Sequence, residues 1–235
     1  MTLALLIFST NVFSQSKFYI GVEANFIQDQ YLIKDEGTAV STPNMHAIDI
    51  PGTTFLLGYQ FNPVFSLETG IATRPVKIGY GLNFDDVRTM SESSNAYYHI
   101  PLRTRAVVPL IGNWLSGTAS VGVQLSVTDP TRIGTTSTGG YGEGGGTRNG
   151  EPLYSRRSSY TSYNSIFFTV SSDLGLQFNL SKKFSLYTTI SYNRGFKALE
   201  KVDIEYQYMN EPVKKANIRH QGTYISPNFG LKYRF

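Results

Sequence analysis

The sequence predicts an all-β fold: an eight-stranded antiparallel up-and-down transmembrane β-barrel with short turns at one end and long loops at the other. Three observations predict it. Eight segments alternate between apolar and polar residues, each is about long enough to cross a bilayer as a tilted strand, and the connections alternate between short and long. Only 16% of the 235 residues are charged, compared with roughly 25% in soluble domains.

Each of the eight segments places apolar side chains on one face and small or polar side chains on the other. In the last segment, for example, Phe229, Leu231 and Tyr233 share one face. A period of two is the signature of a β-strand whose faces meet different surroundings. The predicted strands cover residues 17–26, 54–61, 65–72, 99–108, 115–125, 168–178, 184–193 and 224–235.

The connections between these strands fall into two classes. Tight turns are predicted at residues 62–63, 111–113 and 181–183, and long loops at 28–51, 79–96, 127–164 and 199–222. If both ends of the chain lie in the periplasm, every tight turn lies on that side and every long loop lies outside. The glycine-rich run at 139–151 predicts a mobile stretch of loop that packs no core.

Volume decides which face points outward. An eight-stranded barrel has an interior just wide enough for side chains to fill, and at least nine Phe on the apolar faces would crowd it. We therefore expect the apolar faces to contact lipid, where a Lys or Arg at mid-bilayer would cost about 2–4 kcal/mol. Six charged residues within the spanning parts of the predicted strands lie on the opposite, lumenal faces: Glu23, Glu68, Arg103, Arg105, Asp173 and Lys232.

These six residues predict a lumenal ion-pair network. Glu68 should meet Arg105 or Arg103, because the third and fourth strands are neighbours, and Glu23 can approach Lys232 where the first and last strands close the barrel. Buried charges need partners, so the favoured interpretation is a plug that closes the barrel. The alternative is that the same charges line a narrow water path.

Residues 1–16 are typical of a signal peptide, and residues 17–235 then form the barrel domain. Leu3 to Phe8 is a short apolar core, and small residues follow at a spacing that fits cleavage after Ser14 or Ser16. No Lys or Arg precedes the apolar run, so a truncated start or an apolar first strand is the alternative.

Several stretches carry a resemblance to a known family. The segments "LLGYQFNPVFSLETGI", "YYHIPLRTR" and "LGLQFNLSKKFSLYTTISY" resemble the outer-membrane protein β-barrel domain family of Gram-negative bacteria, which includes small OmpA- and OmpX-like barrels. The final "GLKYRF" resembles the signal that barrel-insertion machinery recognises, carried here by Phe229, Leu231, Tyr233 and Phe235. The resemblance covers residues 17–235. It implies a porin-like protein of the cell envelope, integral to the outer membrane, with lipid, lipopolysaccharide and the insertion machinery as partners.

The loops and the histidines carry the remaining functional candidates. Tyr154, Arg156, Arg157 and Tyr160 predict a surface contact, either with an extracellular or envelope protein or with lipopolysaccharide phosphates. The three histidines show no metal-ligand spacing, and the scattered Lys and Arg show no nucleic-acid footprint, so no metal, cofactor or nucleic acid is expected.

The sequence favours a structural or surface-interaction role without catalysis. A narrow pore for small solutes or ions is one alternative, and a soluble lipocalin-like carrier is another. A lipid A-modifying barrel enzyme is a third, since His99 could act as a base near Ser91, Ser93 or Ser94.

Overall fold

The computed structural model describes residues 17–42, 51–85, 88–127, 137–148, 151–163 and 166–235. The predicted signal peptide, residues 1–16, lies outside the described residues. No helix in the described part of the chain is long and apolar enough to cross a membrane. The strands are β1 (Phe18–Asn25), β2 (Gln28–Asp35), β3 (Val40–Ser41), β4 (Gly52–Gln60), β5 (Phe65–Asn83), β6 (Arg88–Ile111), β7 (Leu115–Val127), β8 (Ser137–Arg148), β9 (Glu151–Ser162), β10 (Ile166–Asn179), β11 (Phe184–Gly195), β12 (Glu200–Tyr208) and β13 (Lys214–Arg234).

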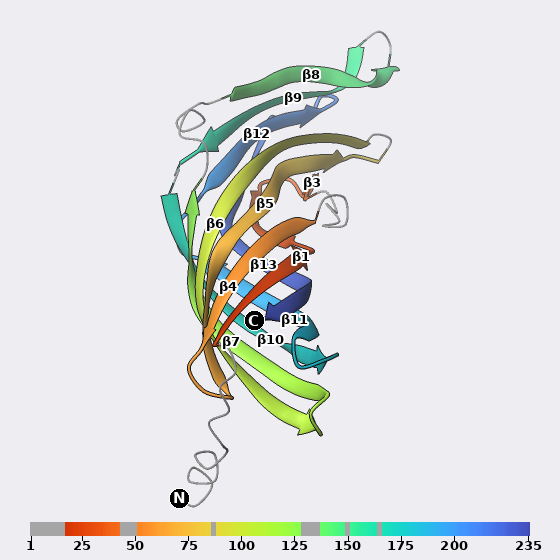
Figure 1. Ribbon diagram of the computed structural model, residues 1–235. Helices are drawn as coiled ribbons and strands as arrows, with labels where there is room; N and C mark the ends of the chain where they lie inside the picture. The colour runs from red at the N-terminus through yellow and green to blue at the C-terminus, as the bar shows by residue number, and fades with distance from the viewer. Residues whose placement is uncertain (1–16, 43–50, 86–87, 128–136, 149–150, 164–165) are drawn as a thin grey trace, which may run out of the picture.

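Eight of these strands close into an antiparallel barrel, which confirms the predicted fold (Figure 1). Their order is β1-β4-β5-β6-β7-β10-β11-β13, and β13 returns to pair with β1, so that Val22 lies opposite Leu231. The three predicted tight turns connect β4 to β5, β6 to β7 and β10 to β11. Two of them are shaped by polar side chains, because Asn62 Oδ1 accepts the backbone N–H of Phe65 and Ser181 Oγ accepts that of Phe184.

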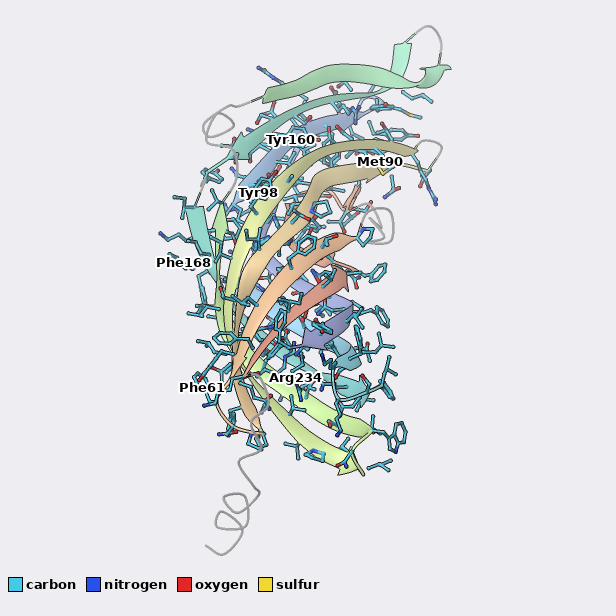
Figure 2. All side chains as sticks on the ribbon, in the orientation of Figure 1. Phe61, Met90, Tyr98, Tyr160, Phe168 and Arg234 are labelled. Atoms are coloured by element: carbon cyan, nitrogen blue, oxygen red, sulfur yellow. The ribbon has the colours of Figure 1, made fainter. Side chains whose placement is uncertain are left out.

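The apolar face of the barrel wall points outward and the polar face points inward, as the volume argument predicts. Large apolar side chains stand on the outside: Leu174 is 70% exposed, Phe55 62% and Ile190 64%. The buried side chains inside are polar or small, among them Thr118, Ser171 and Asn228. Aromatic side chains mark both ends of the apolar band, with Phe61 toward the turn side and Tyr98 and Phe168 toward the loop side (Figure 2).

The predicted long loops are largely strands, which corrects the sequence interpretation. β5, β6 and β13 continue past the barrel, and β2, β3, β8, β9 and β12 pair beside them (Figure 1). The glycine-rich run expected to be mobile loop lies mostly in β8, which pairs with β9. We call these added strands, together with residues 74–83, 88–97 and 214–223, the loop-side extension.

The loop-side extension has a hydrophobic core of its own. Ile78, Tyr80 and Leu82 of β5 cluster with Val202, Ile204 and Tyr206 of β12 and with Ala216 and Ile218 of β13. Burial and a hydrogen bond of 2.8 Å from its hydroxyl to Asp35 raise the pKa of Tyr206, so the phenol stays neutral within this core. Hydrophobic burial therefore stabilises this end of the molecule by the same means as in a soluble domain.

The same alternate positions face inward along the whole length of these strands. Their residues change from polar in the barrel to apolar in the loop-side extension. In β5 the inward side chains change from Ser66 and Glu68 to Val76 and Ile78. In β13 they change from Lys232 and Asn228 to Ile218 and Ala216. Water replaces lipid outside the wall at this height, so apolar side chains move to the inside. The boundary lies near Arg74 and His220.

A cavity in the core of the loop-side extension should destabilise that end of the molecule and leave the barrel folded. Ile218→Ala should cost about 2–5 kcal/mol, because the fully buried side chain leaves a cavity. Leu32→Ala, on the exposed face of the paired strand β2, should change stability by less than about 0.5 kcal/mol. Limited proteolysis of the folded protein in detergent measures the difference, and heat-modifiable gel mobility checks that the barrel is intact. Equal protease resistance in the two variants would contradict this core.

Candidate functional site

Strand pairing brings the six predicted lumenal charges to one level of the barrel. Glu68 lies directly opposite Arg103 on the neighbouring strand, and Asp173 lies opposite Ser120. Glu23 lies opposite Gly230 where β1 pairs with β13. These side chains come from β1, β5, β6, β10 and β13, so the site depends on closure of the whole barrel.

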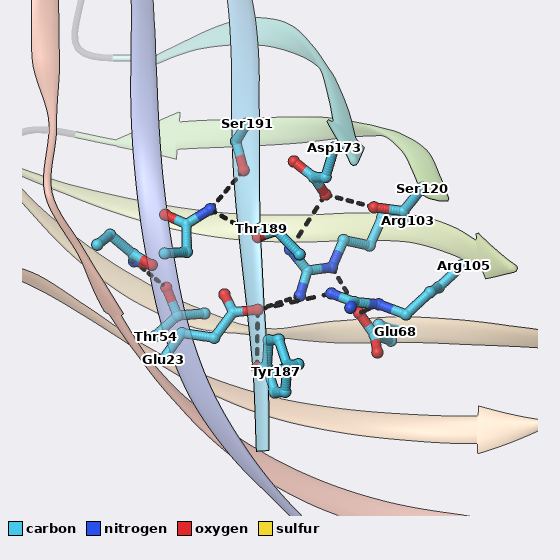
Figure 3. A network of polar contacts seen from close by, with 12 residues as sticks. Glu23, Thr54, Glu68, Arg103, Arg105, Ser120, Asp173, Tyr187, Thr189 and Ser191 are labelled. Carbon is cyan, nitrogen blue, oxygen red and sulfur yellow. Dashed lines mark hydrogen bonds and ion pairs between the residues drawn. The ribbon is translucent and has the colours of Figure 1, made fainter. Parts of the chain in front are cut away.

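Arg103 is the centre of this network (Figure 3). Its Nη2 lies 2.5 Å from Glu23 Oε1, its Nε lies 2.6 Å from Glu68 Oε2, and its Nη1 lies 3.4 Å from Asp173 Oδ2. All five donors of a guanidinium are fixed in one plane, which suits it to bridge carboxylates on different strands. One cation from β6 thus connects β1, β5 and β10.

Glu68 is the second centre, and it is fully buried. Its Oε2 also accepts from Arg105 Nε at 3.0 Å, and its Oε1 lies 2.6 Å from Lys232 Nζ. Glu68 thus contacts both Arg103 and Arg105 of the neighbouring strand. Lys232 pairs with Glu68 rather than with Glu23, because the register places it opposite Gly21, below Glu23.

Two tyrosines complete the network, and the sequence analysis did not anticipate them. Tyr19 donates to Glu68 Oε1 at 2.6 Å, and Tyr187 donates to Glu23 Oε1 at 2.8 Å. Both rings lie 4.8 Å from Lys232 Nζ, within cation–π range. The sequence offers one signal for them: they are aromatic residues on faces otherwise lined with small and polar side chains.

Two glycines make space for these rings. A Cβ at Gly58 would lie 2.0 Å from Cζ of Tyr19, and a Cβ at Gly230 would lie 2.2 Å from Cζ of Tyr187. No larger residue fits while the rings stay in place. Glycine at these inward positions is therefore required by the close approach of an aromatic ring.

The network balances its charges while almost fully shielded from bulk solvent. Glu23, Glu68 and Asp173 supply three carboxylates, and Arg103, Arg105 and Lys232 supply three cations, with every one of the six less than 8% exposed. Burying an ion costs several kcal/mol unless its partners and hydrogen bonds compensate for lost hydration. The hydroxyls of Tyr19, Tyr187 and Ser120 supply part of that compensation.

A second buried ion cluster lies near the boundary with the loop-side extension, and sequence reasoning missed it. Arg74 pairs with Asp29, His220 Nε2 lies 3.2 Å from Asp29 Oδ1, and the guanidinium of Arg74 lies 3.8 Å from the ring centre of Tyr224. Asp29 belongs to a segment predicted as loop, so no strand alternation pointed to it.

A small chamber separates the two ion clusters. It is lined by Arg103 and Asp173 from one cluster and by Arg74 and Tyr224 from the other, and its volume is ≈ 40 Å³. A water needs about 10–15 Å³ measured in this way, so the chamber has room for only a few water molecules. Above it, Val76, Tyr97, Phe167 and Leu199 form a buried apolar layer.

His99 lies inside the barrel wall, facing the lumen. It is 2% exposed, and its Nδ1 lies 2.5 Å from Oγ of Ser126 on the neighbouring strand. Ser91, one of the serines considered as its partner, lies instead 2.9 Å from the hydroxyl of Tyr160. The histidine is thus separated by the barrel wall from the surface that lipid would contact.

The four residues predicted to form a surface contact do not all face solvent. Arg157 is exposed on β9, whereas Tyr154 is 8% exposed and Tyr160 packs against the core of the loop-side extension. Arg156 Nη1 points inward, 3.5 Å from the hydroxyl of Tyr80. Successive residues of a strand point to opposite faces, so only one of the two adjacent arginines faces solvent.

The four residues of the predicted insertion signal lie on the outer face along the last residues of β13 and just beyond its end. Phe229, Leu231 and Phe235 are exposed, and Tyr233 packs edge-on against Phe235.

Comparison with known proteins gives one family match. The family model described as "Outer membrane protein beta-barrel domain" matches residues 1–235. No curated protein matches the chain. Solved structures with a similar arrangement include the outer membrane protein OprG from Pseudomonas aeruginosa, with 9% identity and a TM-score of 0.47 over 94% of this chain and 97% of that chain. The outer membrane protein AlkL has 13% identity and a TM-score of 0.47 over 97% and 93%. The outer membrane protease OmpT from Escherichia coli has 11% identity and a TM-score of 0.42 over 97% and 99%.

Removing the central cation should destabilise the barrel far more than removing an exposed one. Arg103→Met leaves Glu23, Glu68 and Asp173 short of a partner, and we expect a loss of about 3–5 kcal/mol. Lys201→Met removes an ion pair with Asp203 at the surface and should cost less than about 1 kcal/mol. Urea unfolding in detergent, followed by gel mobility, compares the two. Similar unfolding midpoints would show that the lumenal charges do not stabilise the fold.

Proposed function

The chain belongs to the outer membrane protein β-barrel domain family, and from this premise we propose that it is a closed, non-catalytic barrel that presents its loop-side extension for interactions at the cell surface. It lies in the outer membrane, among lipid and lipopolysaccharide. The loop-side extension then faces the outside of the cell, and the three tight turns face the periplasm.

The observation that carries this proposal is the ion-pair network across the lumen. Side chains from opposite walls meet there, since Arg103 of β6 reaches Glu23 of β1 within 2.5 Å. The chamber above has a volume of ≈ 40 Å³, and an apolar layer lies beyond it. An ion that passed would have to break several charge-assisted hydrogen bonds at once, so we favour the plug over a narrow water path.

The surroundings of His99 support a role without catalysis. A lipid A-modifying site needs its base and nucleophile on the lipid side of the wall or at its outer rim. His99 faces the lumen and Ser126 is fully buried beside it. A lipocalin-like carrier in turn needs a ligand cavity of about 300–1,000 Å³ inside the barrel, far larger than the lumenal chamber.

Planar-bilayer recordings test the plug. The wild-type protein should show no steady conductance, and Arg103→Ala/Arg105→Ala should conduct, because it deletes both arginine side chains that cross the lumen. Lys182→Ala/Lys183→Ala removes the same charge from an exposed periplasmic turn and should stay closed. A wild-type protein that already conducts would overturn the closed state in favour of the narrow pore.

A further inference from the structure

Positive charge gathers at the turn-side rim of the barrel, apart from the lumenal network. Lys17, Lys182, Lys183 and Arg234 lie at this end, and we call these four residues the basic rim. We propose that the basic rim binds glycerophospholipids with a net negative charge in the periplasmic leaflet. The inference rests on the proposed function in one respect, which is the placement of the tight turns in the periplasm.

The charge at this end of the barrel has one sign. The chain segments that meet there contain no Asp or Glu: residues 17–22, 59–67, 106–119, 174–187 and 229–235. None of the four cations of the basic rim forms an ion pair within the described residues, and the three lysines are exposed. Counting a terminal carboxylate on Phe235 still leaves an excess of three positive charges. An unbalanced patch of this kind attracts anions.

Strand pairing places the basic rim on one side of the barrel. The backbone N–H of Arg234 donates to the carbonyl oxygen of Lys183 at 2.8 Å, and the N–H of Gln60 donates to that of Lys17 at 2.7 Å. The ends of β11, β13, β1 and β4 are therefore neighbours here, and Arg234 lies at the same end as Phe61 (Figure 2). The other two tight turns contain no charged residue, so the patch does not continue around the rim.

Lys17 stands at the edge of a group of three aromatic rings. Its Nζ lies 5.9 Å from the ring centre of Tyr59. The ring of Tyr59 in turn lies 5.0 Å from that of Phe18 and 5.3 Å from that of Phe61. Phe18 and Phe61 are both exposed on the apolar outer face. An ammonium group and lipid-facing rings therefore lie side by side.

Lys183 repeats this arrangement on the other side of Arg234. Its Nζ lies 5.9 Å from the ring centre of Tyr233, which lies 5.0 Å from the ring of Phe184 and 5.4 Å from that of Phe235. Phe184 and Phe235 are exposed in the same way. The β1–β13 junction is thus flanked by two matching units, each with one lysine and three rings.

The composition of these units selects the partner. Aromatic girdles mark the height of the membrane interface, so each ammonium group lies at the level of the lipid headgroups. A headgroup phosphate can approach the ammonium while the acyl chains of the same molecule contact the exposed rings. A soluble acidic protein would satisfy the cations alone. Anionic lipids attract basic residues near the membrane surface, whereas zwitterionic lipids supply no net charge for this attraction.

Tryptophan quenching by brominated lipids measures which lipid lies beside a chosen position. Trp114 is the single Trp of the chain and lies in the turn from β6 to β7. In the closed order of the eight strands, equal numbers of strands separate this turn from the β1–β13 junction in either direction, so Trp114 reports the opposite side of the rim. The variant Trp114→Phe/Phe184→Trp moves the reporter into the unit of Lys183.

Both reporters are compared in phosphatidylcholine nanodiscs that contain a rising fraction of brominated phosphatidylglycerol or of brominated phosphatidylcholine. At position 184 the anionic lipid should associate about fivefold more strongly than the zwitterionic one, the effect expected of one lysine near an anionic headgroup. At Trp114 the two lipids should associate equally. Excess glycerol 3-phosphate in the buffer should not displace the anionic lipid, because it lacks acyl chains.

Variants of the position-184 reporter assign the preference to the basic rim. Lys17→Gln/Lys182→Gln/Lys183→Gln should reduce it to less than about twofold. The same three positions changed to Arg keep the charge and should retain it. Lys34→Gln/Lys214→Gln/Lys215→Gln is the matched control, since it removes three lysines from the loop-side extension and should also retain it. Heat-modifiable mobility shows that each variant is folded, and Lys183→Gln alone replaces the triple change if that variant fails to fold.

Four results would overturn the proposal. The two lipids could associate equally at position 184, which would leave the basic rim to a soluble acidic partner. Trp114 could show the same preference, which would make it a property of the whole rim. The preference could survive loss of the three lysines, or glycerol 3-phosphate could abolish it. Conductance does not depend on the rim lysines, so failure of the plug and failure of this site are distinguishable.

Discussion

The narrow lumen of an eight-stranded barrel is the constraint on which the rest of this structure depends. Its inward side chains meet across the axis, so any charge placed there must find its partner among the other walls. Arg103 satisfies this requirement with carboxylates from three strands, and Glu68 satisfies it with cations from β6 and β13. A hydrated pore needs room for water beside its charges, and this lumen leaves room for only a few molecules.

The loop-side extension continues several of the same strands, but its outer face meets water instead of lipid. Beyond the bilayer the outer face meets water, so β5 and β13 turn apolar residues inward and polar residues outward without changing which side chains face the axis. The barrel therefore supplies a rigid base for a small sandwich-like core of Tyr80, Ile204 and Ile218. A surface held in this way presents its outward side chains in fixed rows, which loops of the same length would not do.

This change from polar to apolar inward residues also explains which strands could be predicted from the sequence. Strict alternation with apolar residues on the lipid side predicted all eight barrel strands, and the structure confirms them. The third predicted strand ends at residue 72, near the height at which Arg74 and Val76 reverse the pattern of β5. The sequence analysis searched for strands with apolar outward faces. It therefore assigned the segments beyond that point, whose outward faces are polar, to loops.

The site was predictable to a similar extent. Six inward charges could be assigned to one level because their strands and depths follow from the alternation. Their individual pairing could not, since it depends on register and on the reach of Lys232 toward Glu68. Tyr187 and Gly230 illustrate the limit: a missing Cβ and a distant ring become complementary only when β11 and β13 are paired.

The lumenal charges can also specify the register in which the barrel strands pair. Because side chains alternate with period two, a slip of β13 by one residue would move Lys232 to the lipid face and bring Leu231 inside. Near the turn-side interface the displaced charge would itself cost up to about 1 kcal/mol, and Glu68 would lose a partner 2.6 Å away. An apolar lumen would lack this penalty, since lipid and interior would then accept the same residues. The ion pairs therefore distinguish the native closure from its slipped alternatives, in addition to whatever net stability they contribute.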